Sequence, residues 1–270
     1  MRLVGIFTSD LLKDSIAIVS GGGTGLGKQM AIELGRAGAS IVIAGRRSEV
    51  LKEAEVDFQK EGIPILSVQT DIRKPNEVDN LIQRTVDTYG QVNILVNNAG
   101  GQFPMRAEEL SVNGWNAVVN NNLNGTFYMT RAFGRQVIAQ GTGGVITNII
   151  INSVHRGIPG IAHSVAARSG VYGMTKTLAL EWAKHHIRVN AVGPGLFITQ
   201  GFSEEMEEAA DKDFVTRTQQ AVPLGRTGRP EELGWLVTYL SSPAAAYITG
   251  EYINIDGGNA LAGGINFFPA

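Results

Sequence analysis

The chain has 270 residues and a formal net charge of −2, with 23 Lys and Arg against 25 Asp and Glu. A nearly neutral chain without a basic stripe is not expected to bind nucleic acid. Cysteine is absent, which excludes disulfides, thiolate metal sites and a cysteine nucleophile, and agrees with a reducing compartment.

Two features argue against a membrane or secreted protein. No apolar run reaches the roughly 18–20 residues that span a bilayer. Residues 1–15 carry charges where a signal peptide needs an apolar centre. We therefore expect a cytoplasmic protein with no membrane partner.

Short runs of β-branched residues alternate with longer helical patterns, which is typical of repeated βαβ units and a parallel sheet. Predicted strands cover residues 16–20, 40–44, 64–69, 93–97, 144–150, 187–192 and 252–255. Predicted helices cover residues 26–37, 47–60, 75–89, 115–139, 163–184 and 230–241. Because the strand runs are almost entirely apolar, helices are expected on both faces of the sheet. The sequence therefore predicts one α/β domain over residues 1–270, a Rossmann-type three-layer sandwich.

A long segment between the sixth predicted strand and the last helix lacks strand character. It covers residues 197–228 and is bounded by glycine and proline. Because long loops in compact domains are commonly functional, we expect this segment to be a lid over the substrate.

A glycine-rich turn, Ser20-Gly-Gly-Gly-Thr-Gly-Leu-Gly27, joins the first strand to the first helix. Glycines in this place permit a tight turn and let backbone amides approach a pyrophosphate at the helix N-terminus, which predicts a dinucleotide site. Residues 22–28 also fit the start of a nucleoside-triphosphatase P-loop. That alternative is weak because Gln29 stands where a magnesium-binding Ser or Thr is required.

The second strand ends at Gly45, Arg46 and Arg47. An acidic residue here would bind the ribose 2′-hydroxyl of NAD, whereas arginine accommodates the 2′-phosphate of NADP. The sequence therefore favours NADP(H). The alternative is that both arginines are solvated residues at the start of a helix.

Together with the turn, several further motifs resemble the short-chain dehydrogenase/reductase superfamily over essentially the whole chain. The matching pieces are residues 20–27, Asp71-Ile72, Asn-Asn-Ala-Gly at 97–100, Asn122, residues 188–195 and residues 248–258. The resemblance implies a doubly wound, seven-stranded parallel sheet. It also implies a homotetramer that pairs through the helices at 115–139 and 163–184 and through the C-terminal region.

The resemblance also implies the cofactor site. Asp71 and Ile72 would contact the adenine, residues 98–100 the ribose and residues 194–199 the nicotinamide. The expected cofactor-binding residues are Gly21, Thr24, Gly25, Leu26, Gly27, Arg46, Arg47, Asp71, Ile72, Asn98, Ala99, Gly100, Arg168, Pro194, Gly195, Ile198 and Thr199.

The chain departs from the superfamily at its usual Ser, Tyr and Lys positions. When the register is fixed by Asn190, the Tyr position falls on Ser164, the Lys position on Arg168 and the Ser position on Ile151. Tyr172 and Lys176 do fit Tyr-x-x-x-Lys, but eight residues later. On a helix this offset is about 12 Å of rise and roughly 80° of rotation, so we expect this pair to lie away from the nicotinamide.

The pattern instead resembles the acyl-CoA branch, the trans-2-enoyl-CoA and 2,4-dienoyl-CoA reductases. The similar stretches are residues 100–103, 125–129 and 163–172. In the dienoyl-CoA enzymes a Ser replaces the usual Tyr and helps hold the thioester carbonyl. The resemblance implies that Phe103 and Ser111 line the acyl-CoA site and that Arg73 meets a CoA phosphate. Those enzymes also use a Tyr near the fifth strand, where this chain has Ser153.

These residue types favour conjugate reduction over ketone reduction. A Ser hydroxyl is a poor acid for an alkoxide, whereas an enolate oxygen needs only hydrogen-bond donors. We expect Ser164 to be such a donor, Arg168 a cation beside the ribose and the enolate, and Asn122 the holder of a relay water. His163 is a candidate second donor. His155, His185 and His186 show no metal-binding spacing, so no metal is expected.

Two other functions stay open at this point. One is a carbonyl or alcohol dehydrogenase that uses Tyr172 and Lys176. The other is a regulator that binds NADP(H) without turnover, as the missing Tyr and Lys would allow.

Overall fold

The computed structural model describes residues 6–199 and 214–262. Its strands pair in parallel in one seven-stranded sheet, in the order β3-β2-β1-β4-β5-β6-β7. They are β1 (Ile16–Ser20), β2 (Ser40–Gly45), β3 (Ile65–Gln69), β4 (Ile94–Asn97), β5 (Gly144–Ile149), β6 (Ile187–Pro194) and β7 (Tyr252–Ile255). The strand order reverses between β1 and β4, which is where ligands bind in sheets of this kind.

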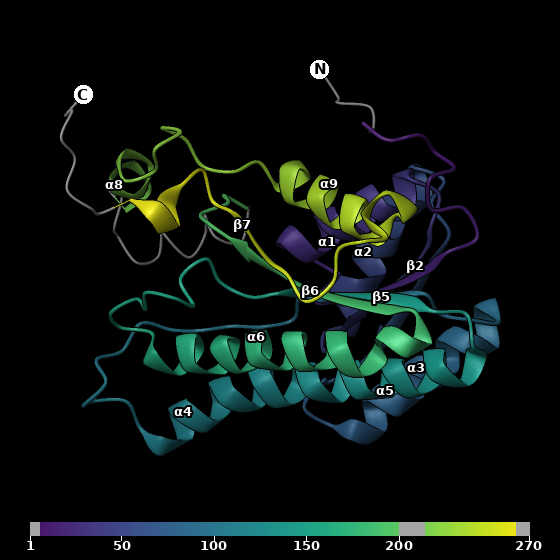
Figure 1. The fold of residues 1–270 in the computed structure, drawn as a ribbon, viewed down its shortest axis with the longest axis horizontal. Coiled ribbons are helices and arrows are strands. Elements are labelled where there is room, and N and C mark those ends of the chain that lie inside the picture. Colours follow the sequence, from purple (N-terminus) through teal and green to yellow (C-terminus); the bar gives the residue numbers. More distant parts are fainter. Residues whose placement is uncertain (1–5, 200–213, 263–270) are drawn as a thin grey trace.

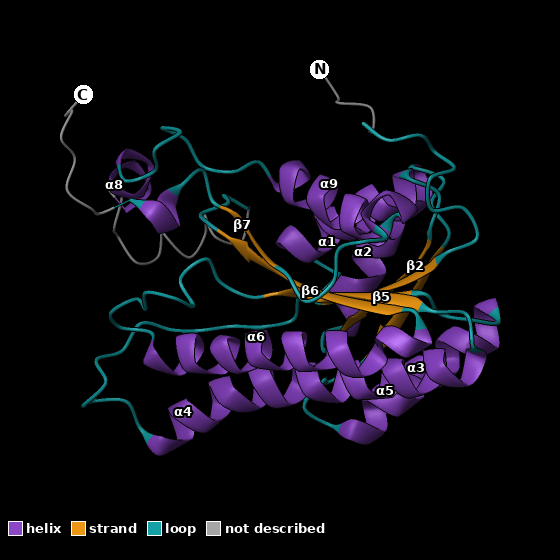
Figure 2. Cartoon of the chain, in the orientation of Figure 1, coloured by secondary structure: helices purple, strands orange, loops and turns teal. Residues whose placement is uncertain are grey.

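Helices cover both faces of this sheet (Figure 1). They are α1 (Gly25–Arg36), α2 (Ser48–Lys60), α3 (Pro75–Tyr89), α4 (Val112–Val119), α5 (Gly125–Gln140), α6 (Ala162–Trp182), α8 (Phe214–Gln220) and α9 (Pro230–Ser241). Figure 2 shows α1, α2 and α9 on one side of the strands and α3, α4, α5 and α6 on the other. The predicted doubly wound three-layer sandwich is confirmed.

Alternate residues of the central strands contribute to two hydrophobic cores, one on each face of the sheet. In β1, Ala17 and Val19 pack with α1 and α9, whereas Ile18 packs on the opposite face with α3 and α5. β2 repeats this pattern, with Ile41 and Val42 on opposite faces. Both faces of the central strands are therefore buried away from water, which explains why their sequences are almost entirely apolar. Each fully buried valine or isoleucine among them contributes roughly 1.5–3 kcal/mol.

The predicted helix at 115–139 differs from the structure in two ways. It begins earlier, at Val112, because Ser111 caps it by accepting a hydrogen bond from the Gly114 N–H at 3.0 Å. It is also interrupted by a π-helical segment, η1 (Asn120–Asn124), which separates α4 from α5. Such π segments are frequent at functional sites, and this one contains Asn122.

The other predicted elements are confirmed with boundary differences of at most two residues, the largest being at the ends of β6, which continues to Pro194, and of α6, which ends at Trp182. Across residues 6–199 and 214–262, no helix combines the length and the apolar character needed to cross a membrane.

Candidate active site

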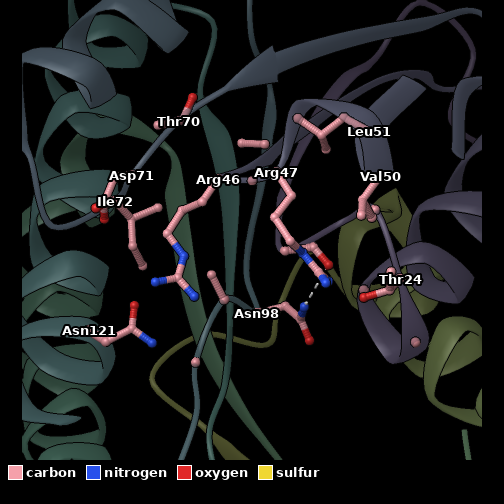
Figure 3. Close-up of a pocket in the computed structure, with 18 of the residues that line it drawn as sticks. Thr24, Arg46, Arg47, Val50, Leu51, Thr70, Asp71, Ile72, Asn98 and Asn121 are labelled. Atoms are coloured by element: carbon pink, nitrogen blue, oxygen red, sulfur yellow. Dashed lines mark hydrogen bonds between the residues drawn. The ribbon is translucent and has the colours of Figure 1, made fainter. Parts of the chain in front are cut away.

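A cleft of about 370 Å³ opens at the carboxyl ends of β1, β2 and β4 (Figure 3). Its walls are the glycine-rich turn, the ends of β2 and β3, and the loop after β4. The structure brings together in it twelve of the expected cofactor residues, namely Gly21, Thr24, Gly25, Leu26, Gly27, Arg46, Arg47, Asp71, Ile72, Asn98, Ala99 and Gly100.

The turn after β1 requires its glycines for both conformation and space. Gly21 and Gly25 have φ of +67° and +53°, a region that L side chains rarely adopt. A Cβ on Gly27 would lie 2.2 Å from the Gly21 carbonyl oxygen. Thr24, the N-cap of α1, makes no side-chain capping bond, so the first amides of this helix stay available to an anion. The turn therefore fits a pyrophosphate.

The loop after β4 is fixed directly to this turn. Ser20 Oγ accepts hydrogen bonds from the backbone N–H groups of Asn98 and Ala99, both at 3.0 Å. Asn98 Nδ2 donates to the Ser20 carbonyl at 3.0 Å. One rigid wall of the cleft therefore combines segments from the first and fourth strands.

Two arginines give the cleft a positive charge. In Figure 3 the Arg46 side chain extends in the direction of Asn121, and the Arg47 side chain extends in the direction of Thr24. Both side chains are exposed, and within the described part of the chain neither forms an ion pair with a carboxylate. They are therefore available to an anionic group in the cleft.

Asp71 is held by a neighbouring arginine. Arg73 donates to both oxygens of the carboxylate, with Nε at 2.8 Å from Oδ1 and Nη2 at 2.6 Å from Oδ2. The hydrogen bond from Arg73, helped by the charges of Arg73 and Arg46, lowers the pKa of Asp71 to about 2. Arg73, expected at a CoA phosphate, is thus engaged by Asp71 in this structure.

Gly100 joins the cleft to a group of polar side chains around the start of α6. A Cβ on Gly100 would lie 3.2 Å from both Arg168 Nη2 and Asn122 Oδ1. Ser164 is completely buried one helical turn before Arg168. Its hydroxyl accepts a hydrogen bond from Arg168 Nη1 and donates to Gln102 Oε1 at 2.6 Å. The structure therefore brings together Ser164, Arg168 and Asn122.

Arg168 lies in an environment poor in water. Burial lowers the pKa of its guanidinium to about 10. Among the described residues no carboxylate pairs with it. A desolvated cation without a carboxylate partner is destabilising in itself, so an anionic or developing negative charge on a ligand would be stabilised here.

Asn122 holds the loop that follows Gly100. Its Oδ1 accepts from the Gly101 N–H at 3.0 Å and its Nδ2 donates to the Gly101 carbonyl at 2.9 Å. Its own carbonyl accepts from Thr126 Oγ1 at 2.8 Å. The side chain thus fixes the backbone next to Gln102, while the relay water remains a prediction.

Phe103 and His163 pack together beside Ser164. Their rings meet edge to face at a centroid distance of 4.8 Å. His163 is buried, and its Nδ1 accepts from the Ser164 backbone N–H at 2.9 Å. Its Nε2 has no hydrogen-bond partner among the described residues. A Cβ on Gly114 would lie 3.0 Å from Phe103 Cζ and 3.3 Å from Ser111 Oγ, so the two expected acyl-CoA residues do lie near each other.

Tyr172 occupies different surroundings. Its ring contacts those of His155 and Tyr252 at centroid distances of 5.5 and 5.2 Å. Lys176 Nζ lies over the face of the Tyr172 ring, 4.4 Å from the centroid. Among the described contacts none joins Tyr172 to Ser164. The offset of eight residues along α6 thus gives Tyr172 and Ser164 different neighbours.

The segment after β6 returns to the glycine-rich turn. Gly195 N–H donates to the Ile255 carbonyl at 3.0 Å, and Thr199 side-chain atoms lie 3.8 Å from the position of a Cβ on Gly25. Pro194 ends β6, and Ile198 precedes Thr199. The expected nicotinamide segment therefore spans from the sheet to the turn.

The expected lid at 197–228 is described only in part, since residues 200–213 lie outside the described residues. The two ends of this segment are joined, because Phe197 and Gly228 form a β-bridge and Gly228 N–H donates to the Leu196 carbonyl at 2.9 Å. Its role as a lid remains a prediction.

Two polar groups were not assigned a role from the sequence. Gln102 belongs to a stretch that carries the resemblance, but nothing in its spacing indicates the bond to Ser164. Asn152 is tied to Asp256 Oδ2 at 2.9 Å, and Ser153 donates to its Oδ1 at 2.9 Å. In the ranges that the structure covers, no group of three or more His, Asp or Glu could hold a metal ion.

Comparison with known proteins agrees with this arrangement. A family model described as enoyl-(acyl carrier protein) reductase matches residues 21–260. A probable 2,4-dienoyl-CoA reductase of Bacillus subtilis (strain 168) is 38% identical over 251 residues, which cover 93% of this chain and 98% of that protein.

Two solved structures are also similar. A short-chain dehydrogenase from Bacillus anthracis is 41% identical, with a TM-score of 0.83 and coverage of 96% of this chain and 100% of the other. A variant of actinorhodin polyketide ketoreductase, solved with NADPH, is 32% identical with a TM-score of 0.87, and the match covers 94% of this chain and 99% of the other.

Proposed function

Because this chain belongs to the short-chain dehydrogenase/reductase family of oxidoreductases, we propose that it is an NADPH-dependent reductase of conjugated enoyl- or dienoyl-CoA thioesters. The observation that carries this proposal is the buried hydroxyl of Ser164, hydrogen-bonded to Arg168 at the position where the family usually has its acid. The Bacillus subtilis relative, named as a probable 2,4-dienoyl-CoA reductase, supports the same substrate class.

The residues of the cleft fit NADP(H). The turn at Gly21 and Gly27 leaves room for a pyrophosphate, and Arg46 and Arg47 offer two positive charges for a 2′-phosphate. Arg168 would bind the nicotinamide ribose from the other side of Gly100. When bound, the cofactor supplies the hydride for the reduction.

The chain's own residues act on the substrate oxygen. Reduction of a conjugated thioester develops negative charge on the thioester oxygen, and the Ser164 hydroxyl donates to that atom. A single donor of this kind is worth about 2.7–4 kcal/mol of transition-state stabilisation. Arg168 keeps its charge at neutral pH because its pKa of about 10 lies well above 7. Its positive charge then favours the enolate.

A substrate panel tests the proposal. Enoyl-CoA, dienoyl-CoA, 3-oxoacyl-CoA and simple ketones would each be offered with NADPH, and the loss of NADPH absorbance followed. We expect turnover with the conjugated thioesters and little with ketones. A preference for ketones or 3-oxoacyl-CoA would instead support a carbonyl reductase that uses Tyr172 and Lys176. NADPH binding without turnover of any substrate would indicate a regulator.

The assembly in solution is proposed to be a homotetramer. Large apolar side chains are exposed on the helices expected to pair, with Val112 on α4 75% exposed, Phe127 on α5 44% and Leu180 on α6 82%. Contact with another copy of the chain would remove these side chains from water, which supports pairing through these helices. Light scattering should give a mass near four chains, and a monomer at all concentrations would contradict this assembly.

A further inference from the structure

The amide oxygen of Gln102 occupies a position where two hydrogen-bond donors converge. Ser164 donates its hydroxyl proton to Gln102 Oε1 at 2.6 Å, and Arg168 Nη1 lies 3.5 Å from the same atom. Arg168 Nη1 also donates to the Ser164 oxygen, which orients the hydroxyl proton toward Gln102. A planar carbonyl oxygen thus already receives the donors that the proposed reaction needs.

We propose that the Gln102 carboxamide is an internal placeholder for the carbonyl group of the substrate, which must displace it to reach Ser164 and Arg168. A carboxamide and a thioester both present an sp² carbonyl oxygen, so one can replace the other against the same donors. This inference rests on the proposed function, because it takes the substrate to be a thioester whose oxygen meets Ser164.

The loop permits this exchange by rotation of one side chain. The residue before Gln102 is fixed, because Asn122 bonds both the N–H and the carbonyl of Gly101. The residue after it is anchored by the edge-to-face packing of Phe103 on His163. Gln102 itself is exposed, so its amide regains water when it leaves. The exchange then requires only that Gln102 break its hydrogen bonds to Ser164 and Arg168 and change rotamer, without movement of the backbone.

When no substrate is present, Gln102 accepts the hydrogen bonds that Ser164 and Arg168 donate. Ser164 is completely buried, and a buried hydroxyl without an acceptor is destabilising. Gln102 provides that acceptor in the free protein. The consequence is competition, because the apparent affinity for the substrate is reduced by the fraction of molecules in which Gln102 is in place.

The test compares three variants with the wild type. Gln102→Met keeps the length of the side chain and removes the carbonyl oxygen. Gln102→Glu replaces the amide by a carboxylate that pairs with Arg168. Gln83→Met, on the exposed face of α3, makes the same chemical change far from the cleft. The ligand is butyryl-CoA, a saturated thioester that has no conjugated double bond to reduce. Its dissociation constant is measured by calorimetry with NADP⁺ bound.

We expect Gln102→Met to bind butyryl-CoA about fivefold more tightly, the equivalent of one ordinary net hydrogen bond. Gln102→Glu should bind it at least about tenfold more weakly, because a charge-assisted pair is roughly twice as strong. With an enoyl-CoA, Gln102→Met should lower KM and change kcat little. Gln83→Met should match the wild type, and NADP⁺ affinity should be the same in the wild type, Gln102→Met and Gln83→Met.

Each other outcome overturns a defined statement. Weaker binding by Gln102→Met would show that Gln102 holds the substrate and is no placeholder. Equal binding by the wild type and Gln102→Met would remove the inference and leave the proposed function intact. If neither the wild type nor any variant binds butyryl-CoA or turns over an enoyl-CoA while NADP⁺ still binds, the inference and the proposed function fall together.

Discussion

The nucleotide end and the chemical end of the candidate site are built in opposite ways. The nucleotide end is mainly backbone, shaped by Gly21 and Gly25 in left-handed conformations, with the exposed side chains of Arg46 and Arg47 reaching into it. The chemical end is made of side chains withdrawn from water, with Ser164 completely buried and Arg168 desolvated.

This difference has consequences for both recognition and mutation. A backbone cradle binds the pyrophosphate common to NAD and NADP, so discrimination between the two falls to a few exposed charges. A buried side-chain group acts as one unit, so the loss of a single member affects the whole reaction. Changes at the chemical end should therefore alter turnover, whereas changes at the nucleotide end should alter cofactor choice.

The largest effect is expected at Ser164. Ser164→Ala removes the proposed donor to the thioester oxygen and should lower kcat by about 10²–10³, with NADPH affinity nearly unchanged. Tyr172→Phe is the matched control, because it also removes one hydroxyl from α6 and should change kcat little. Steady-state kinetics with an enoyl-CoA give kcat for each variant, and a separate titration gives its NADPH affinity.

The reverse result would place the chemistry elsewhere. Near-normal turnover in Ser164→Ala, with collapse in Tyr172→Phe and a lost basic limb of the pH profile, would assign proton donation to Tyr172. The reacting atoms of the substrate would then lie near Tyr172 and not beside Ser164, where the proposed function puts them.

A smaller effect is expected at Arg46. Arg46→Asp should weaken NADPH binding by about tenfold and relatively favour NADH, because a carboxylate repels the 2′-phosphate and accepts hydrogen bonds from a 2′-hydroxyl. Arg84→Asp on α3 makes the same charge change away from the cleft and should leave both affinities unaltered. Fluorescence titrations with both cofactors measure the ratio, and equal affinities in the wild type would contradict the assignment of NADP(H).

The smallest effect is expected at Asp71 in the cofactor-free protein. Its pKa in the folded state, about 2, lies below the ordinary value of 3.8. The pair with Arg73 therefore stabilises the fold above about pH 4, and this contribution is lost as the pH falls toward 2. Because Arg73 is largely in solvent, Asp71→Asn should cost only about 0.5–1 kcal/mol at pH 7.

Urea unfolding of the wild type and of Asp71→Asn at pH 7, 4 and 2.5 measures this difference. A cost that stayed constant down to pH 2.5 would show that the pKa shift is not its source.

The nucleotide end could be predicted from the sequence because its signals are local. The turn at 20–27 and Arg46 follow directly on strands whose apolar runs are unmistakable, and the structure brings these segments to one cleft. The proximity of Ser164 and Arg168 could also be predicted, since α6 is one unbroken helix from Ala162 to Trp182 and residues four apart lie on the same face of a helix.

Other features depend on contacts that no local pattern specifies. The π segment at Asn120–Asn124 interrupts a helix that reads as continuous, and Asn122 within it bonds to Gly101, 21 residues away. Ser111 is the N-cap of α4, a local role that was not predicted from the sequence, while its expected place at the substrate stays a prediction. Gln102 lies in an irregular loop without periodicity, so its bond to Ser164, 62 residues away, had no signal in the sequence.

The hydrogen bonds that join Ser20 to the loop after β4 also bear on the order in which the protein folds. They connect residues 78 and 79 positions apart, and closing such a loop costs entropy before its contacts stabilise anything. A growing chain that ends after β3 contains the glycine-rich turn and both arginines, yet lacks the wall formed by residues 98–100. We therefore expect the dinucleotide site to be complete only after β4 has paired with β1, and a cofactor that binds the complete site then stabilises the folded sheet by mass action.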